Sequence, residues 1–317
     1  MKARNIFQTV ALGALIAVVA QGNMSIVFGQ TTIGNAQKIA IGGPANGSWT
    51  GGTALYAITL RNNATEIWQY GTGTQWIQHW SNGLTGTPIA ITVDPDGAPV
   101  VLTSNNKMYW CTGKDYRQPW VLAESNTQGG NEVLIGGFLA HPNPLWMSKV
   151  DGAWQANWLK NWQTNTWVTI WSGWPMHMHA ADAKNHVWQI SNNPDGNILS
   201  QDEAFNMYQS YNGFYFIPFN GFMGAHAVAA SQYKYTLNTI YGQAYAVYAS
   251  DNYGYVWQKT TSNNPVWQQV AQNPIGDIWS LNKSMAVDAN GWPYVANDNG
   301  AVYSNINLAG WVKISNP

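Results

Sequence analysis

The sequence predicts an all-β protein: a β-propeller of six four-stranded blades that follows an N-terminal signal peptide. Three observations support this prediction: the composition, an internal repeat of roughly 44 to 55 residues, and short alternating strands bounded by turn residues. The chain holds 19 Trp, 16 Tyr, 31 Gly and 14 Pro, but only 14 basic and 15 acidic residues. This aromatic content excludes a disordered chain. So few charged residues also disfavour a helical bundle, whose surfaces are rich in Lys, Glu and Arg.

The first thirty residues have the layout of a secretory signal peptide. Lys2 and Arg4 precede an apolar run over residues 10–20, and small residues follow at candidate cleavage positions. A membrane anchor is the alternative, but the run is far shorter than the ~20 apolar residues that span a bilayer. We therefore expect removal of residues 1–30, with cleavage between about 20 and 30. The secreted product is then a single domain over residues 31–317, without a membrane span.

Tryptophans recur at a regular interval and mark the repeat. The members of this series are Trp76, Trp120, Trp167, Trp267 and Trp311, which lie 44, 47, 100 and 44 residues apart. The gap of 100 is about two periods, with residues 214–217 near its middle as the missing member. An indole covers a large area of a blade interface while its N–H reaches a loop carbonyl. These five tryptophans are therefore predicted to be structural.

The second repeat contains the four strands of one blade in order. They are expected at residues 89–93, 99–103, 108–112 and 120–123. Asp94 and Gly97 lie in the first turn, where an Asp side chain bonds to nearby backbone and Gly accepts a positive φ. Residues 287–293 repeat the same V-D-x-x-G-x-P phrase, with Asp288 and Gly291 at the equivalent structural positions.

The other repeats are aligned with this one by shorter matches. Tyr56 aligns with Tyr245, because a Trp-Gln pair follows each of them twelve residues later. Inner strands are expected near Lys38, Val133, His177, His226 and Ser284. Short strands with Gly, Asn, Asp and Pro turns at this period indicate radial repetition of four-stranded sheets. An unrepeated β-sandwich is the alternative, but sandwich strands show no fixed long period.

The second and sixth repeats share an extended phrase. It covers residues 89–101 and 108–110 in one repeat, and residues 285–295, 301–303 and 311–314 in the other. Both resemble a tectonin repeat, and the resemblance extends over most of the chain after residue 35. Several tectonin-type propellers are secreted or surface lectins, so the resemblance implies six tectonin-like repeats and binding of glycans or bacterial surface polysaccharide. Composition and spacing alone predict only the propeller.

Few residues are suited to catalysis. After residue 30 the only arginines are Arg61 and Arg117, too few for the arginine cluster that holds a carboxylate in sialidase propellers. The chain has four glutamates, and most aspartates lie in turn phrases, so paired-carboxylate glycosidase chemistry is the minor alternative. No nucleophile elbow, H-E-x-x-H pair or phosphate loop is present. We therefore expect no enzymatic activity and no cofactor.

Metal and nucleic-acid binding are also disfavoured. His177 and His179 lie two apart on a predicted strand, with His186 nearby, and suit either a metal site or a polar channel lining. Without Cys or carboxylates at tight spacing, the structural role is favoured. Cys111 is the single cysteine, so no internal disulfide can form. A net charge of −1 gives no basic surface for nucleic acid.

The surplus of aromatic and amide side chains is the remaining signal. Sugar C–H faces stack on aromatic planes, while amide and carboxyl groups bond the hydroxyls. The candidate glycan-binding residues lie outside the repeat register of tryptophans: Trp80, Trp171, Trp279, Asn282, Asn290 and Trp292. Packing in a blade interface is the equal alternative for each. We expect a secreted lectin with several shallow sites. The alternative is a self-associating structural protein of an extracellular coat or filament, whose exposed aromatics serve protein contacts.

Overall fold

The computed structural model describes most of the chain after residue 31. The described residues are 32–43, 54–70, 75–111, 115–135, 145–151, 154–161, 164–173, 176–181, 187–191, 198–201, 216–218, 225–231, 238–239, 242–243, 246–251, 253–259, 267–271 and 282–317. The predicted signal peptide, residues 1–30, lies outside them, and so do Trp279 and His186. Thr31–Pro317 form one compact unit.

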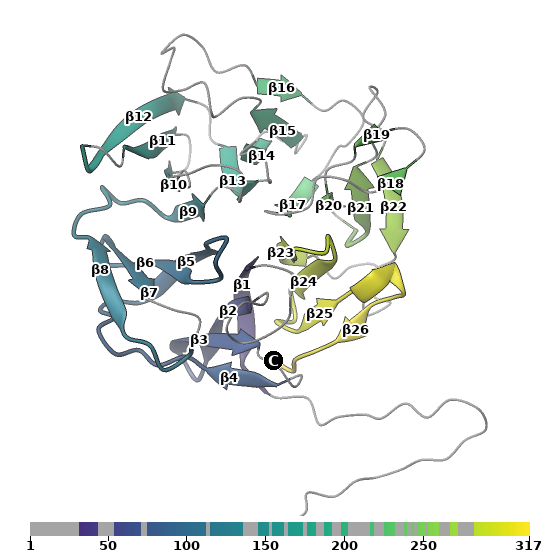
Figure 1. The fold of residues 1–317 in the computed structure, drawn as a ribbon, viewed down its shortest axis with the longest axis horizontal. Helices are drawn as coiled ribbons and strands as arrows, with labels where there is room; N and C mark the ends of the chain where they lie inside the picture. The colour runs from purple at the N-terminus through teal and green to yellow at the C-terminus, as the bar shows by residue number, and fades with distance from the viewer. Residues whose placement is uncertain are drawn as a thin grey trace, which may run out of the picture. The chain divides into compact units, whose positions relative to one another are not determined.

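Within the described residues, the strands form six four-stranded antiparallel sheets, ordered along the chain (Figure 1). The first sheet consists of β1 (Asn35–Gly42), β2 (Ala54–Arg61), β3 (Ala64–Tyr70) and β4 (Trp76–Gln78). The second consists of β5 (Pro88–Val93), β6 (Pro99–Thr103), β7 (Lys107–Cys111) and β8 (Trp120–Glu124). The third consists of β9 (Glu132–Ile135), β10 (Leu145–Asp151), β11 (Trp154–Asn161) and β12 (Thr166–Gly173). The next three are β13 (Met176–Ala181), β14 (Val187–Ser191), β15 (Ile198–Gln201) and β16 (Phe216–Pro218); β17 (Ala225–Ala230), β20 (Val247–Asp251), β21 (Val256–Lys259) and β22 (Trp267–Ala271); and β23 (Asn282–Val287), β24 (Pro293–Asn297), β25 (Val302–Ser304) and β26 (Val312–Lys313).

Two smaller elements complete the described secondary structure. The strands β18 (Asn238–Thr239) and β19 (Gly242–Gln243) form a separate hairpin between β17 and β20. The 3₁₀ turn η2 (Ile306–Leu308) precedes β26. All other described elements are β-strands, which agrees with the predicted all-β class.

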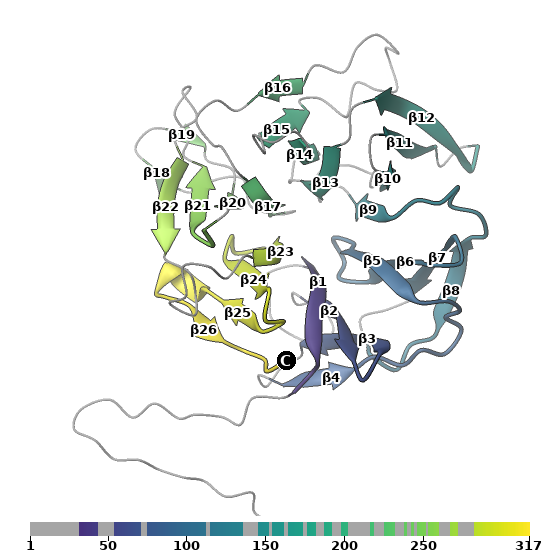
Figure 2. The same cartoon turned by 180° about the vertical axis from the view of Figure 1, so that it is seen from behind.

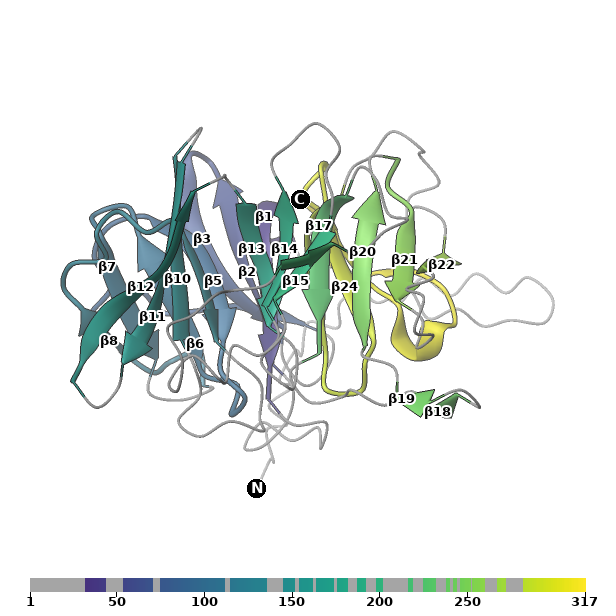
Figure 3. The same ribbon diagram turned by 90° about the horizontal axis from the view of Figure 1, so that it is seen from above.

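The first strands of the sheets contact one another in cyclic order: β1 with β5, β5 with β9, β9 with β13, β13 with β17, β17 with β23, and β23 with β1. Figure 2 shows them nearest the common centre, and Figure 3 shows the strands standing side by side. Radial sheets around shared inner strands define a β-propeller. The propeller prediction is therefore confirmed, whereas six blades for the whole chain stays a prediction.

Apolar clusters between neighbouring sheets hold this arrangement together. One cluster joins the first two sheets through Tyr56, Ile91 and Trp120, and another joins the second and third through Leu102 and Met147. Burying a large apolar side chain contributes about 1.5–3 kcal/mol. In the described part of the chain, apolar side chains of the first and second sheets thus pack against a neighbouring sheet on both faces.

The first and last sheets meet without exchanging a strand. The backbone N–H of Ile33 donates to the carbonyl of Asn316 at 3.1 Å, and Trp76 Nε1 donates to the carbonyl of Ile314 at 2.9 Å. The N–H of Ile39 donates to Ser284 Oγ at 3.0 Å. Hydrogen bonds and an apolar cluster shared by the two sheets therefore close the propeller.

The repeat tryptophans lie at the start of the fourth strands. Trp76, Trp120 and Trp267 begin β4, β8 and β22 and are at most 8% exposed, while Trp167 in β12 and Trp311 before β26 are half-buried. Trp120 Nε1 donates to the carbonyl of Trp80 at 2.8 Å, and Trp167 Nε1 to Glu124 Oε2 at 3.1 Å. Like Trp76, each of these indoles bonds to the preceding sheet.

Tyrosines of second strands bond to the following sheet. Tyr56 Oη donates to the carbonyl of Gly97 at 3.1 Å, and Tyr248 Oη donates to the carbonyl of Gly291 at 2.8 Å. Tyr248 is therefore the equivalent of Tyr56, and the alignment with Tyr245 is wrong by three positions. The β20–β21 hairpin is shorter than the β2–β3 hairpin, so the same Trp-Gln pair follows its tyrosine after fewer residues.

The predicted turn residues do what short Asp turns require. Asp94 Oδ1 accepts the N–H of Ala98 at 2.7 Å, and Asp288 Oδ1 accepts that of Trp292 at 2.8 Å. The glycine three residues after each aspartate, Gly97 and Gly291, has a φ of 91° and 84°. Sequence reasoning missed that Asp251 and Asn297 form the same turn in the last two sheets.

Burial raises the pKa of the Asp94 carboxyl to about 6, and it raises the pKa of Asp288 in the same direction. The ordinary value in an unfolded chain is about 3.9. The folded protein therefore binds the Asp94 proton more tightly, and stability should rise as the pH falls from about 7 to 4, by up to about 1.4 kcal/mol per pH unit. Urea unfolding across this range measures the slope.

Asp94→Asn should flatten this pH dependence, because asparagine keeps the acceptor oxygen but does not titrate. Asp96→Asn, in the same turn at an exposed position, is the matched control. It should reduce the slope far less than Asp94→Asn, because burial raises the Asp94 pKa more than the nearby Asp96 charge does. Equal slopes for Asp94→Asn and the unsubstituted protein would contradict the assignment.

Candidate functional site

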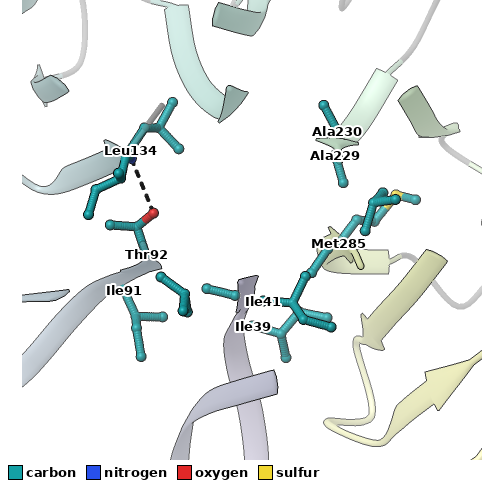
Figure 4. A pocket seen from close by; sticks show the side chains of 13 residues that line it. Ile39, Ile41, Ile91, Thr92, Leu134, Ala229, Ala230 and Met285 are labelled. Atoms are coloured by element: carbon teal, nitrogen blue, oxygen red, sulfur yellow. Dashed lines mark hydrogen bonds between the residues drawn. The ribbon is translucent and has the colours of Figure 1, made fainter. Parts of the chain in front are cut away.

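The centre of the propeller encloses a narrow apolar cavity. Side chains of Ile39, Ile91, Leu134 and Met285 line it, from β1, β5, β9 and β23 (Figure 4). Its volume is about 70 Å³, well below the roughly 300–1,000 Å³ of typical small-molecule sites. This cavity is thus too small for a sugar ring, so we look for a glycan site nearer the surface.

The segment that follows β4 presents an exposed tryptophan. The Trp80 side chain is 49% exposed, although its backbone N–H and carbonyl both form hydrogen bonds. Its N–H donates to the carbonyl of Tyr116 at 2.8 Å, and its carbonyl accepts the Trp120 indole N–H. These bonds join the first sheet to the second. A large aromatic surface is therefore offered to solvent on a fixed backbone.

Charged groups lie in the same loop as Tyr116. Arg117 Nε donates to Asp115 Oδ1 at 3.2 Å, and the guanidinium lies 5.0 Å from the centre of the Tyr116 ring. The N–H of Arg117 also donates to Asp115 Oδ1, at 2.9 Å. This bond and the guanidinium lower the pKa of the Asp115 carboxyl. The loop thus offers a hydrogen-bond acceptor and several donors beside the Trp80 backbone. We call Trp80, Asp115, Tyr116 and Arg117 the rim site.

A buried histidine supports the rim site from below. His79 is 4% exposed, and its ring centre lies 5.0 Å from that of Trp120 and 6.2 Å from that of Tyr56. Burial lowers the pKa of its imidazole, so the ring is neutral near pH 7. Its Nε2 lies 3.8 Å from Cys111 Sγ, and Cys111 is completely buried. These two side chains therefore pack between the first two sheets and are too buried to contact a ligand.

A glycine lets the rim segment lie against the second sheet. Gly83 has a φ of 86°, and a Cβ atom there would be 2.2 Å from the carbonyl oxygen of Trp120. Next to it, the carbonyl of Asn82 accepts the Trp120 N–H at 2.8 Å. Only glycine combines this backbone conformation with so close an approach.

The remaining predicted ligand residues are not brought together at this site. Trp171 lies in β12, where it pairs with Asn157. Trp292 and Asn290 are half-buried in the β23–β24 turn, and their N–H groups both donate to Asp288. Trp279 lies outside the described residues. The described candidates thus lie in three different sheets, with Asn282, Asn290 and Trp292 in the last one.

The placement of Asn282 does not suit a ligand contact. The residue is 0% exposed, and its Nδ2 donates to the carbonyl of Gly254 at 3.2 Å. Asn282 begins β23 and links it to the β20–β21 turn of the preceding sheet. Its role is therefore structural, and the predicted ligand contact is withdrawn for this residue.

Asp115 and Arg117 are the functional candidates that sequence reasoning missed. Their signal was a pair of opposite charges two residues apart, just before a repeat tryptophan, in a chain with few charges. Among the residues that the structure describes, no three His, Cys, Asp or Glu side chains gather as metal ligands. His177 and His179 lie in β13, which has a bulge between Met178 and Ala180. No helix in the described part of the chain is both long and apolar enough to span a bilayer.

Comparisons with known proteins support the fold alone. No family model and no curated protein matches the chain. The solved structure of SapL1 lectin in complex with alpha methyl fucoside has a TM-score of 0.52 at 13% identity, covering 88% of this chain and 96% of that one. A streptogramin B lyase has a TM-score of 0.52 at 9% identity, with 91% and 86% covered. The WD40 β-propeller domain of Doa1 has a TM-score of 0.50 at 8% identity, with 92% and 85% covered.

These similarities place the chain among proteins of propeller fold. They include a lectin and a lyase, and identities this low carry no information on activity. The tectonin resemblance is not confirmed by them. Function must therefore be argued from the side chains of this chain.

Proposed function

We propose that this protein is a secreted, tectonin-like lectin that binds glycans at shallow sites on its blades without cleaving them. The observation that carries the proposal is the Trp80 indole, half exposed on a backbone that hydrogen bonds hold between two sheets. An exposed aromatic on a rigid support loses little entropy when a ligand stacks on it.

The rim site supplies both kinds of contact that a sugar needs. The C–H face of a pyranose stacks on the indole plane, and its hydroxyls donate to Asp115 and accept from Arg117. Because the site is shallow, we expect dissociation constants from millimolar to tens of micromolar, or about −4 to −6 kcal/mol. Several blades that engage one polysaccharide would then supply avidity.

Catalysis is not supported by the groups at the rim site. Its single carboxylate, Asp115, already accepts two bonds from Arg117, and its lowered pKa disfavours the protonated form that a general acid needs. The buried imidazole of His79 does not reach the surface. A reducing-end assay on any bound glycan should therefore detect no released sugar.

Trp80→Ala should weaken binding to the preferred neutral glycan by about tenfold or more, equivalent to about 1.4 kcal/mol. A glycan array finds the ligand, and a titration compares the variants. Trp80→Phe should keep part of the affinity, because it retains an aromatic face. Tyr253→Ala is the matched control: this aromatic is 57% exposed in another sheet, and its loss should have little effect.

Equal binding by Trp80→Ala and the unsubstituted protein would overturn the rim site. Absence of any glycan ligand, together with spontaneous polymerisation, would favour the assembly protein. Secretion belongs to the same proposal. Intact-mass measurement of the secreted protein supports it if the mature chain begins between residues 21 and 31. A mature product that retains Met1 or Lys2 refutes it.

A further inference from the structure

A second cavity of about 60 Å³ opens among the first strands, continuous with the apolar centre through Ile39, Ile91, Leu134 and Met285. Unlike the centre, it has charged groups in its lining: Lys38 from β1, Lys283 from β23 and Glu132 from β9. We call this the channel mouth. None of its residues was a predicted ligand contact.

A repeated β-bulge positions one of the two lysines of the mouth, Lys283. The first strand has a β-bulge after its first one or two residues in four sheets, and the extra residues are Gln37, Ile89, His226 and Lys283. A bulge re-aims a side chain that regular alternation would bury, and bulges are frequent next to functional sites. Of these four residues, Lys283 lines the mouth.

Amide groups lie beside Lys283. Asn35 Oδ1 accepts Gln37 Nε2 at 2.8 Å, and Lys283 Nζ lies 3.4 Å from the same oxygen. Gly300 packs directly against Asn35, since a Cβ there would be 2.4 Å from Asn35 Oδ1. The amides and one lysine are thus fixed at the seam between the first and last sheets, while Lys38 is exposed.

The charge at the mouth favours an anion. Lys38 and Lys283 face a single carboxylate, Glu132, which already accepts Ser148 Oγ at 2.7 Å. Two cations on adjacent strands repel each other, and an oxyanion between them relieves that repulsion. The cavity has room for a carboxylate, and the adjoining cavity of about 70 Å³ is too small for a sugar ring.

We propose that the channel mouth binds the carboxylate of an acidic saccharide, held by Lys38 and Lys283, while Asn35 and Gln37 bond hydroxyls of the same sugar. This inference rests on the proposed lectin function and adds a ligand class, uronic-acid glycans, at a site distinct from the rim. Acidic polysaccharide would then engage the mouth and the rim with different salt dependence.

The test is a titration with trigalacturonate, its neutral galactose counterpart and inorganic phosphate. Trigalacturonate should bind, and Lys38→Gln/Lys283→Gln should weaken it at least tenfold while leaving neutral-glycan binding unchanged. Lys107→Gln, on β7, is the matched control and should have no effect. Raising the ionic strength from about 0.05 to 0.5 M should weaken acidic binding much more than neutral binding, because salt screens charged pairs.

The outcomes separate this inference from the proposed function. The channel mouth is refuted if trigalacturonate does not bind, or if the double variant binds it as tightly as the unsubstituted protein. If neutral-glycan binding still requires Trp80 in that case, the rim site is supported. Phosphate that binds as tightly as trigalacturonate shows a site for oxyanions in general and overturns the saccharide assignment. Trigalacturonate binding without any neutral-glycan binding supports the mouth and refutes the rim site.

Discussion

Trp120→Ala is expected to lower the free energy of unfolding by about 3–5 kcal/mol, as truncation of a large buried aromatic does. The Trp120 side chain is 3% exposed and packs in the apolar cluster between the first two sheets. Its indole N–H also donates to the carbonyl of Trp80, and that bond is lost with it. The substitution therefore removes apolar contact and one of the bonds that fix the rim segment.

Urea unfolding measures this loss, with Val121→Ala as the control. Val121 follows Trp120 in β8 but is 49% exposed, so its truncation should change stability by no more than about 0.5 kcal/mol. A cost below about 1 kcal/mol for Trp120→Ala would show that the indole does not carry the interface. Glycan binding should fall together with stability in Trp120→Ala, since Trp80 loses its support.

Gly83→Ala should destabilise the protein by about 2–5 kcal/mol, from two separate causes. A positive φ costs a residue with a Cβ about 1–2 kcal/mol, and overpacking against fixed atoms adds about 1–3 kcal/mol. The neighbour here is the backbone carbonyl of Trp120, 2.2 Å from the added atom, which cannot move without breaking β8 pairing. The segment carrying Trp80 must therefore shift.

Gly129→Ala isolates the second cause. Its φ of 80° nearly matches that of Gly83, but the nearest atoms are the end of the Lys149 side chain at 3.5 Å. It should show the backbone cost alone and no change in glycan binding, whereas Gly83→Ala should lose both stability and binding. Equal effects of the two substitutions in thermal unfolding and in binding would refute the proposed packing of the rim segment.

The second sheet was the part most predictable from sequence. Its four strands begin and end within two residues of the predicted bounds, because alternation and the turns at Asp94–Gly97 and residues 104–107 are encoded locally. The repeat tryptophans were predictable for the same reason, since each lies at the start of a fourth strand. The equivalence of Tyr248 and Tyr56 was missed because the alignment assumed a constant spacing between the tyrosine and the following Trp-Gln pair. That spacing differs between the two sheets, because their hairpins differ in length.

The rim site could be predicted only in part. Trp80 was identified because it lies outside the repeat register, but its exposure depends on Gly83 and on the second sheet. Asp115 and Arg117 come from a different repeat, and their loop is joined to Trp80 through the bond from its N–H to the Tyr116 carbonyl, between two blades. Asn282 appeared equally suitable in sequence, yet a bond to Gly254 buries it. Contacts between sheets, which are remote in sequence, decide such cases.

The most direct test of the account is an NMR titration that follows the indole N–H groups with the preferred neutral glycan. Trp80→Phe assigns the Trp80 resonance, and Trp120→Phe assigns that of its buried neighbour. The account predicts a saturable shift of the Trp80 resonance at the concentration range of binding, with a far smaller change for Trp120. Saturable binding that leaves the Trp80 resonance unmoved would contradict it.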